Sequence, residues 1–187
     1  MSGSFRLFSI FALAITFLWL GGFKNAAFGQ GPPPSELTDA ERASLKPPIT
    51  WPTFGDAFEA AKTTKKIVLI DVWSSTCGWC RKQQAEVYTR PDLQAFLFDK
   101  FELGRLNLDV TDDTVSFRGY TLSSQMLAGG LGATGTPTTV FMEPDGSYIT
   151  RLQGFHAYED FYDVLRFIGT SSYKEMSFEE FMTKLGK

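Results

Sequence analysis

An apolar run that leads into a pair of cysteines constrains the fold of this chain more than any other feature. Ile67 to Trp73 is a continuous series of mainly apolar, largely β-branched residues, interrupted by one acid, Asp71. Such a run is typical of a central strand that is covered on both faces. Cys77 and Cys80 follow, at the start of a helix predicted over residues 77–88. The sequence therefore predicts an α/β domain with two sulfurs just after a central strand.

The spacing of the two cysteines gives them different roles. When a Cys-x-x-Cys pair opens a helix, its first sulfur lies at the helix N-terminus, where free N–H groups and the helix dipole favour a thiolate. Cys77 is therefore the expected nucleophile. The second sulfur lies one turn later, close enough to attack a mixed disulfide, so Cys80 is the expected resolving thiol. Arg81 and Lys82 add positive charge beside the pair.

Other uses of the cysteine pair fit the sequence less well. A c-type haem site requires His directly after the second Cys, and position 81 is Arg. A structural zinc site needs four ligands, whereas the chain offers these two cysteines and a distant His156. A structural disulfide across so short a loop would stabilise the fold less than one that closes a long loop. The metal site and the structural disulfide remain as less favoured alternatives, and no metal is expected.

The order of the remaining elements predicts a mixed sheet. The length suits one domain with a core of its own. Strands are expected over 101–109, 137–142 and 148–153, and helices over 54–63, 92–100, 123–128 and 158–168. Residues 110–135 are otherwise a long connection. Pro144-Asp145-Gly146 separates the last two strands as in a β-hairpin. Ser177 and Glu180 open a last short helix as a capping box.

The N-terminal part of the chain is expected to direct export. Residues 1–29 resemble a signal peptide, with a cation at Arg6, an apolar run from Leu7 to Leu20 and small residues near Ala26. An uncleaved membrane tether over residues 7–23 is the alternative, because a span needs about 17–25 residues. Residues 30–50 are expected to be a Pro-rich linker with one helical turn opened by Thr38. Residues 51–170 would form the working domain and 171–187 a C-terminal helical extension.

Two stretches of the chain resemble thioredoxins. Asp71-Val72-Trp73-Ser74-Ser75-Thr76-Cys77-Gly78-Trp79-Cys80 is similar to their active-site stretch, and Gly135-Thr136-Pro137-Thr138-Thr139-Val140-Phe141 to their cis-proline loop and the strand after it. The resemblance covers roughly residues 54–169. Within the superfamily, the signal segment, Trp79, the 117–119 connection and the 173–178 tail look most like SoxW-type periplasmic thioredoxins, which are associated with sulfur oxidation.

The resemblance implies a thioredoxin fold, a central mixed sheet flanked by helices, and roles for further residues. Asp71 would hold a raised pKa and exchange a proton with Cys80, the alternative being a strand-end acid paired with Arg105. Trp73 would be a platform beside the disulfide or a core residue. Trp79 would be exposed to partners. A cis bond between Thr136 and Pro137 would place their backbone beside the sulfurs for an extended substrate, unless Pro137 is a plain turn proline.

The resemblance and the composition together indicate a function. A net charge of −3 leaves no basic surface for nucleic acid. The implied activity is that of a periplasmic thiol–disulfide oxidoreductase, which reduces disulfides of exported proteins or sulfur carriers in cell redox homeostasis. It would take electrons from a membrane thiol transporter and bind no cofactor, since no nicotinamide or flavin motif is present. Gly78 and Trp79 replace the Gly-Pro of cytoplasmic thioredoxins, so a disulfide oxidase or isomerase is an alternative. A non-catalytic metal-delivery or chaperone module is another.

Overall fold

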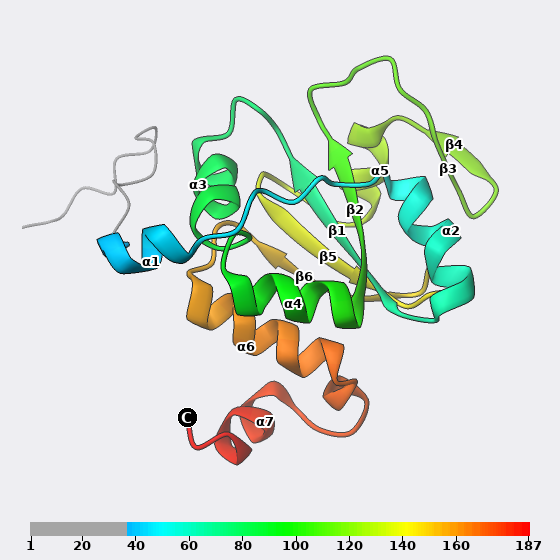
Figure 1. Ribbon diagram of the computed structural model, residues 1–187. Helices are drawn as coiled ribbons and strands as arrows, with labels where there is room; N and C mark the ends of the chain where they lie inside the picture. Colours follow the sequence, from blue (N-terminus) through cyan, green and yellow to red (C-terminus); the bar gives the residue numbers. More distant parts are fainter. Residues whose placement is uncertain (1–36) are drawn as a thin grey trace, which may run out of the picture. The chain divides into compact units, whose positions relative to one another are not determined.

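The strand before the cysteines lies in the interior of a four-stranded sheet. The computed structural model describes residues 37–187. The strand order is β2 (Phe101–Asn107), β1 (Ile67–Trp73), β5 (Thr138–Met142) and β6 (Tyr148–Gln153). β1 is parallel to β2 and antiparallel to β5, and β6 is antiparallel to β5 (Figure 1). The predicted mixed sheet is confirmed.

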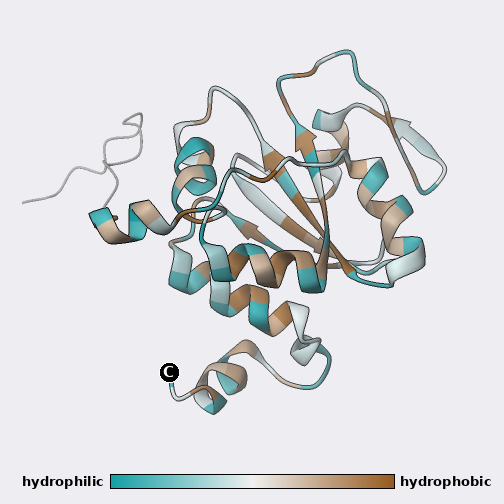
Figure 2. Ribbon diagram, in the orientation of Figure 1, coloured by the Kyte–Doolittle hydropathy of each residue, from teal (hydrophilic) through white to brown (hydrophobic). Residues whose placement is uncertain are grey.

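Helices cover both faces of this sheet, because side chains of β1 alternate between two apolar clusters. Ile67 and Leu69 pack with α4 (Pro91–Lys100) and α6 (Tyr158–Gly169). Val68 and Ile70 pack on the other face with α2 (Phe54–Thr64) and α5 (Ser124–Gly130). Burial on both faces explains the continuous apolar run, which Figure 2 colours brown along most of β1. The helix α3 (Gly78–Glu86) follows β1 and carries Cys80.

One element was not expected from the sequence. Within the predicted 110–135 connection, β3 (Val115–Phe117) and β4 (Tyr120–Leu122) form a separate two-stranded hairpin. Its turn consists of Arg118 and Gly119, which both have positive φ angles, 50° and 81°. Positive φ at both central residues is what a type I′ turn, one of the two common two-residue hairpin turns, requires. Phe117 fixes the hairpin to the domain, with its ring 5.3 Å from that of Phe54 in α2.

Both ends of the described chain pack on the domain. The predicted signal peptide, the possible tether over 7–23 and the first linker residues lie outside the described residues. The expected helical turn is α1 (Asp39–Ser44). Thr38 opens it as predicted, and Glu41 completes a capping box. Ile49 belongs to the core cluster of α4 and α6. After a 3-10 turn at Ser172–Lys174, α7 (Phe178–Lys184) begins at the predicted capping box. No helix within residues 37–187 is long and apolar enough to cross a membrane.

The first prediction concerns a close approach between β2 and α2. A Cβ atom on Gly104 would lie 2.8 Å from Cδ1 of Ile70 and 2.9 Å from Cβ of Ala57, which is closer than packed atoms can be. We expect Gly104→Ala to lower the free energy of unfolding by about 1–3 kcal/mol, since an overpacked core must shift. Gly55→Ala is the control, because its Cβ would meet only Thr53 Oγ1, at 3.8 Å. Equal urea midpoints for the two variants would contradict this account.

Candidate active site

The two cysteines are joined by a disulfide at the N-terminus of α3. Cys77 is the N-cap residue, with extended backbone angles, and its Sγ accepts a hydrogen bond from the N–H of Cys80 at 3.0 Å. The predicted position of the first sulfur at a helix N-terminus is thus confirmed. Cys77 is half-buried, whereas Cys80 is 1% exposed. The two sulfurs therefore differ in what can reach them.

A short loop between β1 and α3 positions Cys77. The Asp109 carboxylate accepts hydrogen bonds from Ser74 Oγ and from the N–H of Ser75, both at 2.6 Å. These bonds stabilise the charged form and lower the pKa of Asp109. Arg81 Nη1 donates to the carbonyl of Ser75 at 2.5 Å. The carboxylate and the guanidinium together hold the backbone that enters the helix, and Arg81 is not simply solvated.

Asp71 is buried within β1 and forms an ion pair. Its side chain is 1% exposed, and Oδ2 lies 2.7 Å from Nη2 and 2.9 Å from Nε of Arg105. Burial raises the pKa of Asp71, while the charge and hydrogen bond of Arg105 act in the opposite direction. The ion pair that we weighed as an alternative for Asp71 is therefore present, together with the raised pKa. The proton role of this carboxyl stays a prediction.

Residues far apart in the sequence surround Asp71. Gln84 Nε2 lies 3.4 Å from Asp71 Oδ2, and Gln84 shares a helix face with Cys80 one turn earlier. Its Oε1 accepts a hydrogen bond from Trp51 Nε1 at 2.9 Å. The buried Tyr88 hydroxyl lies 3.5 Å from Asp71 Oδ1. Sequence reasoning missed these residues, although the four-residue spacing of Cys80 and Gln84 gave a signal for one of them.

The tryptophans occupy two different surroundings. The Arg105 guanidinium lies between two rings, 4.7 Å from the centroid of Trp51 and 4.8 Å from that of Trp73. Trp73 thus contacts the charged partner of Asp71, at the end of β1. Trp79 is 36% exposed, and its ring centroid lies 5.2 Å from that of Phe155. Trp79 therefore presents part of its ring to solvent beside the cysteines.

The Thr136–Pro137 bond is cis, as predicted. Together with Trp79, Gly154 and Phe155, these two residues line a hollow of about 300 Å³, here called the proline hollow. The Pro137 carbonyl accepts a hydrogen bond from the N–H of Gly154 at 2.8 Å. Within residues 37–187, no backbone hydrogen bond engages Thr136. Thr136 thus lines the hollow beside Trp79 without a backbone partner among the described residues. The described residues contain no cluster of His, Cys, Asp or Glu suited to a metal ion.

The arrangement of strand, cysteine pair and cis-proline is shared with known proteins. A family model described as a thioredoxin-like domain matches residues 54–169. The chain belongs to the thioredoxin-like family. Members of this family are generally oxidoreductases, and the Cys77–Cys80 pair of this thioredoxin-like domain has the spacing of their redox centre. An uncharacterized protein of Caenorhabditis elegans is 29% identical over 105 residues, and the chain spans only 14% of that protein.

Solved structures agree with the fold of this thioredoxin-like domain. A thioredoxin-fold protein from Helicobacter pylori is 24% identical with a TM-score of 0.53, over 64% of this chain and 79% of the other. A thioredoxin from Thermus thermophilus is 23% identical with a TM-score of 0.53, over 67% and 87%. A putative disulphide-isomerase from Bacteroides thetaiotaomicron is 19% identical with a TM-score of 0.50, over 69% and 97%. At such identities the likeness concerns the fold alone.

Proposed function

We propose that this chain is an exported thiol–disulfide oxidoreductase of the SoxW type, which reduces disulfides of exported proteins or of sulfur carriers. The observation that carries the proposal is the unequal exposure of the two sulfurs at the N-terminus of α3. Cys77 is half-buried and open to a disulfide from solvent, whereas Cys80 is buried and bonded to Cys77. This asymmetry suits a reaction in which the first sulfur attacks and the second releases the product.

Reduction of a client disulfide takes two exchanges. The Cys77 thiolate attacks one client sulfur, so the client S–S bond breaks, a Cys77–client bond forms, and the other client sulfur leaves as a thiolate. Cys80 then loses its proton and attacks Cys77 Sγ, which forms the Cys77–Cys80 bond and frees the second client sulfur. Two electrons have passed to the client. Asp71 receives the Cys80 proton in this scheme, because burial raises its pKa toward the range in which a carboxyl accepts one.

The surroundings of the pair supply the client contacts. The backbone of Thr136, beside the cis Pro137, is the part of the proline hollow that can pair with an extended client as an added strand. Trp79 offers an exposed apolar ring on the wall of that hollow. Trp73, at the end of β1, contacts Arg105, the ionic partner of Asp71.

Export and the source of electrons rest on the sequence. Residues 1–29 have the pattern of a signal peptide, which would deliver the domain to the periplasm. The likeness to SoxW-type proteins rests on that segment, on Trp79, on the 117–119 turn of the β3–β4 hairpin and on the C-terminal tail. Because the chain carries no dinucleotide-binding motif, we assign the donor role to a membrane thiol transporter.

The second prediction concerns the direction of electron flow. Gly78 and Trp79 add no charge that would stabilise a Cys77 thiolate, and Lys82 is paired with Glu86 at 2.9 Å. The reduced form is therefore only modestly stabilised. We expect a reduction potential nearer the thioredoxin value of about −270 mV than the strongly oxidising value of about −120 mV. Equilibration with defined glutathione or dithiothreitol ratios measures it. A potential above about −180 mV would instead favour the oxidase or isomerase alternative.

A further inference from the structure

A second groove adjoins the proline hollow. It has a volume of about 350 Å³ and lies between α1, α3 and the start of α6, and we call it the α1 groove. The two depressions share Trp79 and Phe155, whose ring centroids are 5.2 Å apart. The residues that line the α1 groove are Leu37, Glu41, Trp79, Lys82, Glu86, Val87, Arg90, Phe155, Ala157 and Tyr158. The aromatic pair is therefore a wall common to both depressions.

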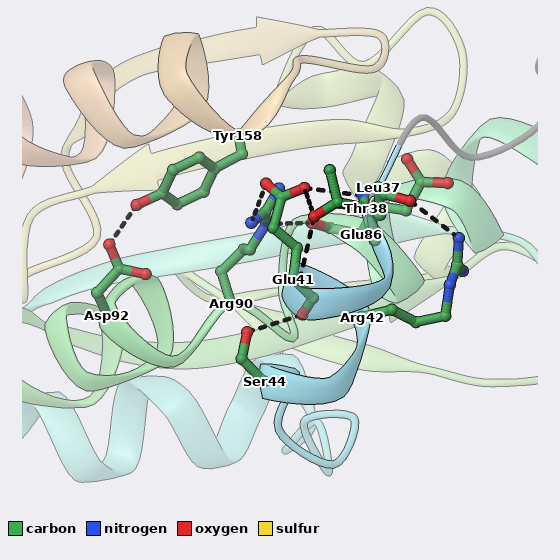
Figure 3. Close-up of polar contacts among 9 residues, drawn as sticks. All are labelled: Leu37, Thr38, Glu41, Arg42, Ser44, Glu86, Arg90, Asp92 and Tyr158. Atoms are coloured by element: carbon green, nitrogen blue, oxygen red, sulfur yellow. Dashed lines mark hydrogen bonds and ion pairs between the residues drawn. The ribbon is translucent and has the colours of Figure 1, made fainter.

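The α1 wall of the groove is fixed by polar contacts. Arg90 Nη1 lies 3.0 Å from Glu41 Oε1, and the Arg90 guanidinium lies 4.8 Å from the centre of the Tyr158 ring. The Tyr158 hydroxyl donates to the Asp92 carboxylate, so α1, α4 and α6 are tied together (Figure 3). Hydrogen bonds from Thr38 and from Arg90 lower the pKa of Glu41 to about 2, which keeps it charged. The groove is thus formed before any ligand arrives.

The charges of the groove are neutralised by one another. Lys82 and Glu86 pair at 2.9 Å, with side chains only 10% and 16% exposed, and Glu41 pairs with Arg90. The four charged side chains of the lining thus form two ion pairs and leave no excess of either sign. The remaining lining is apolar or aromatic: Leu37, Trp79, Val87, Phe155, Ala157 and Tyr158. Such a lining favours an uncharged apolar side chain over an acidic or basic one.

We propose that the α1 groove is a second subsite for the client polypeptide, which takes an apolar side chain a few residues from the client cysteine. The inference rests on the proposed function and deepens it. An extended client that pairs with Thr136 in the proline hollow continues across Trp79 and Phe155 into the groove. The family match begins at residue 54, so α1 lies outside it. Selection of clients thus depends on a segment that the shared domain does not contain.

The test is a leucine scan of a client peptide. Each synthetic peptide carries one cysteine, as a mixed disulfide with thionitrobenzoate, in a Gly/Ser background. A single leucine moves from four residues before the cysteine to four after it. Release of thionitrobenzoate by the pre-reduced protein, in a single turnover with the peptide in excess, gives the second-order rate constant that corresponds to kcat/KM. We expect leucine at one or two positions, on one side of the cysteine only, to raise kcat/KM about tenfold over the leucine-free peptide. A ratio that is the same at all positions would overturn the proposal.

A pair of variants locates the effect. Ala157 is exposed, lines the groove and has an extended backbone that accepts any side chain, so Ala157→Phe fills the groove. Ala95→Phe, on the exposed side of α4 and away from the groove, is the matched control. The quantity compared is kcat/KM for the favoured leucine peptide divided by kcat/KM for the leucine-free peptide. We expect this ratio to fall to about one in Ala157→Phe and to stay at the wild-type value in Ala95→Phe. A ratio that survives in Ala157→Phe contradicts the assignment of the groove.

A binding measurement separates this inference from the reductase proposal. The same peptides, with serine in place of cysteine, are titrated into the oxidised protein, and amide chemical shifts are followed by NMR. The favoured leucine peptide should shift the amide resonances of Glu86, Val87 and Ala157, and the leucine-free peptide should not. If these shifts appear in a protein that reduces none of the disulfide peptides, the groove stands and the reductase proposal fails. If the shifts are absent, the groove assignment fails whatever the activity.

Discussion

A Cys77→Ser variant will reduce no disulfide above the rate of buffer alone, whereas a Cys80→Ser variant will stop after the first exchange as a stable mixed disulfide with its client. The expectation follows from the exposure of the two sulfurs, since only Cys77 is open to a client and only Cys80 can release it. Insulin reduction measures the activity, and non-reducing electrophoresis with mass spectrometry identifies the adduct. The trapped adduct would also name the client.

The serine substitutions are chosen so that α3 remains intact. Cys77 is the N-cap of α3, and serine is a favourable N-cap residue, so loss of activity in Cys77→Ser cannot be attributed to loss of the cap. Far-ultraviolet circular dichroism of both variants checks the helix. An adduct on Cys77→Ser instead of Cys80→Ser would reverse the assigned roles. Absence of insulin reduction in the wild-type protein itself would support the alternative of a non-catalytic binding module.

Arg105→Met will destabilise the protein strongly, and more so at pH 8 than at pH 5. At pH 8 the substitution leaves a buried Asp71 carboxylate without its partner, which typically costs about 3–5 kcal/mol. At pH 5 the carboxyl avoids much of this cost by binding a proton. Burial already raises the pKa of Asp71, and loss of the Arg105 charge raises it further. Urea unfolding of the oxidised variant at the two pH values measures the difference.

The sign of this pH dependence follows from proton binding. Because the pKa of Asp71 is higher in the folded state than in the unfolded chain, the folded state binds more protons between the two pKa values. The stabilisation that Asp71 contributes by binding a proton is therefore fully present below the pKa of this carboxyl in the unfolded chain. It is lost as the pH rises to the pKa of the carboxyl in the folded protein. Adding Asp71→Asn to Arg105→Met should remove the pH-dependent part of the loss. Arg42→Met, on the exposed side of α1, is the control. An equal loss at both pH values would refute the pairing argument.

Much of the fold was predictable because burial leaves a regular pattern in the sequence. Residues 67–73 are apolar since β1 is covered on both faces, and the capping boxes at Thr38 and Ser177 mark real helix starts. The β3–β4 hairpin was missed because its strands have three residues each and its turn is Arg118-Gly119, without the usual Asn-Gly or Asp-Gly signal. So short a hairpin is stable only through contacts such as that of Phe117, which no local pattern reveals.

The site was predictable where its chemistry depends on local spacing. Cys77 and Cys80 lie within one helical turn, so their positions at the N-terminus of α3 followed from sequence alone. The surroundings of Asp71 depend instead on which distant segments the fold brings together. Trp51 precedes α2, and Tyr88 follows α3, yet both lie against the same buried ion pair. Contacts of this kind come from tertiary packing, and a single sequence carries no periodic signal for them.

The segment that contains α1 is separate in sequence from the residues that carry out the redox chemistry, and this separation matters for how the protein can evolve. Asp71, Cys77, Cys80 and Arg105 lie inside the region matched by the family, whereas residues 37–50 precede it. That segment is held by contacts such as Glu41 with Arg90, and Lys46 N–H with the carbonyl of Thr89 at 2.8 Å. An exchange of residues 37–50 between relatives by recombination would therefore leave the electron-carrying residues in place. The surface beside Trp79 can thus diversify while the residues around the Cys77–Cys80 pair stay the same.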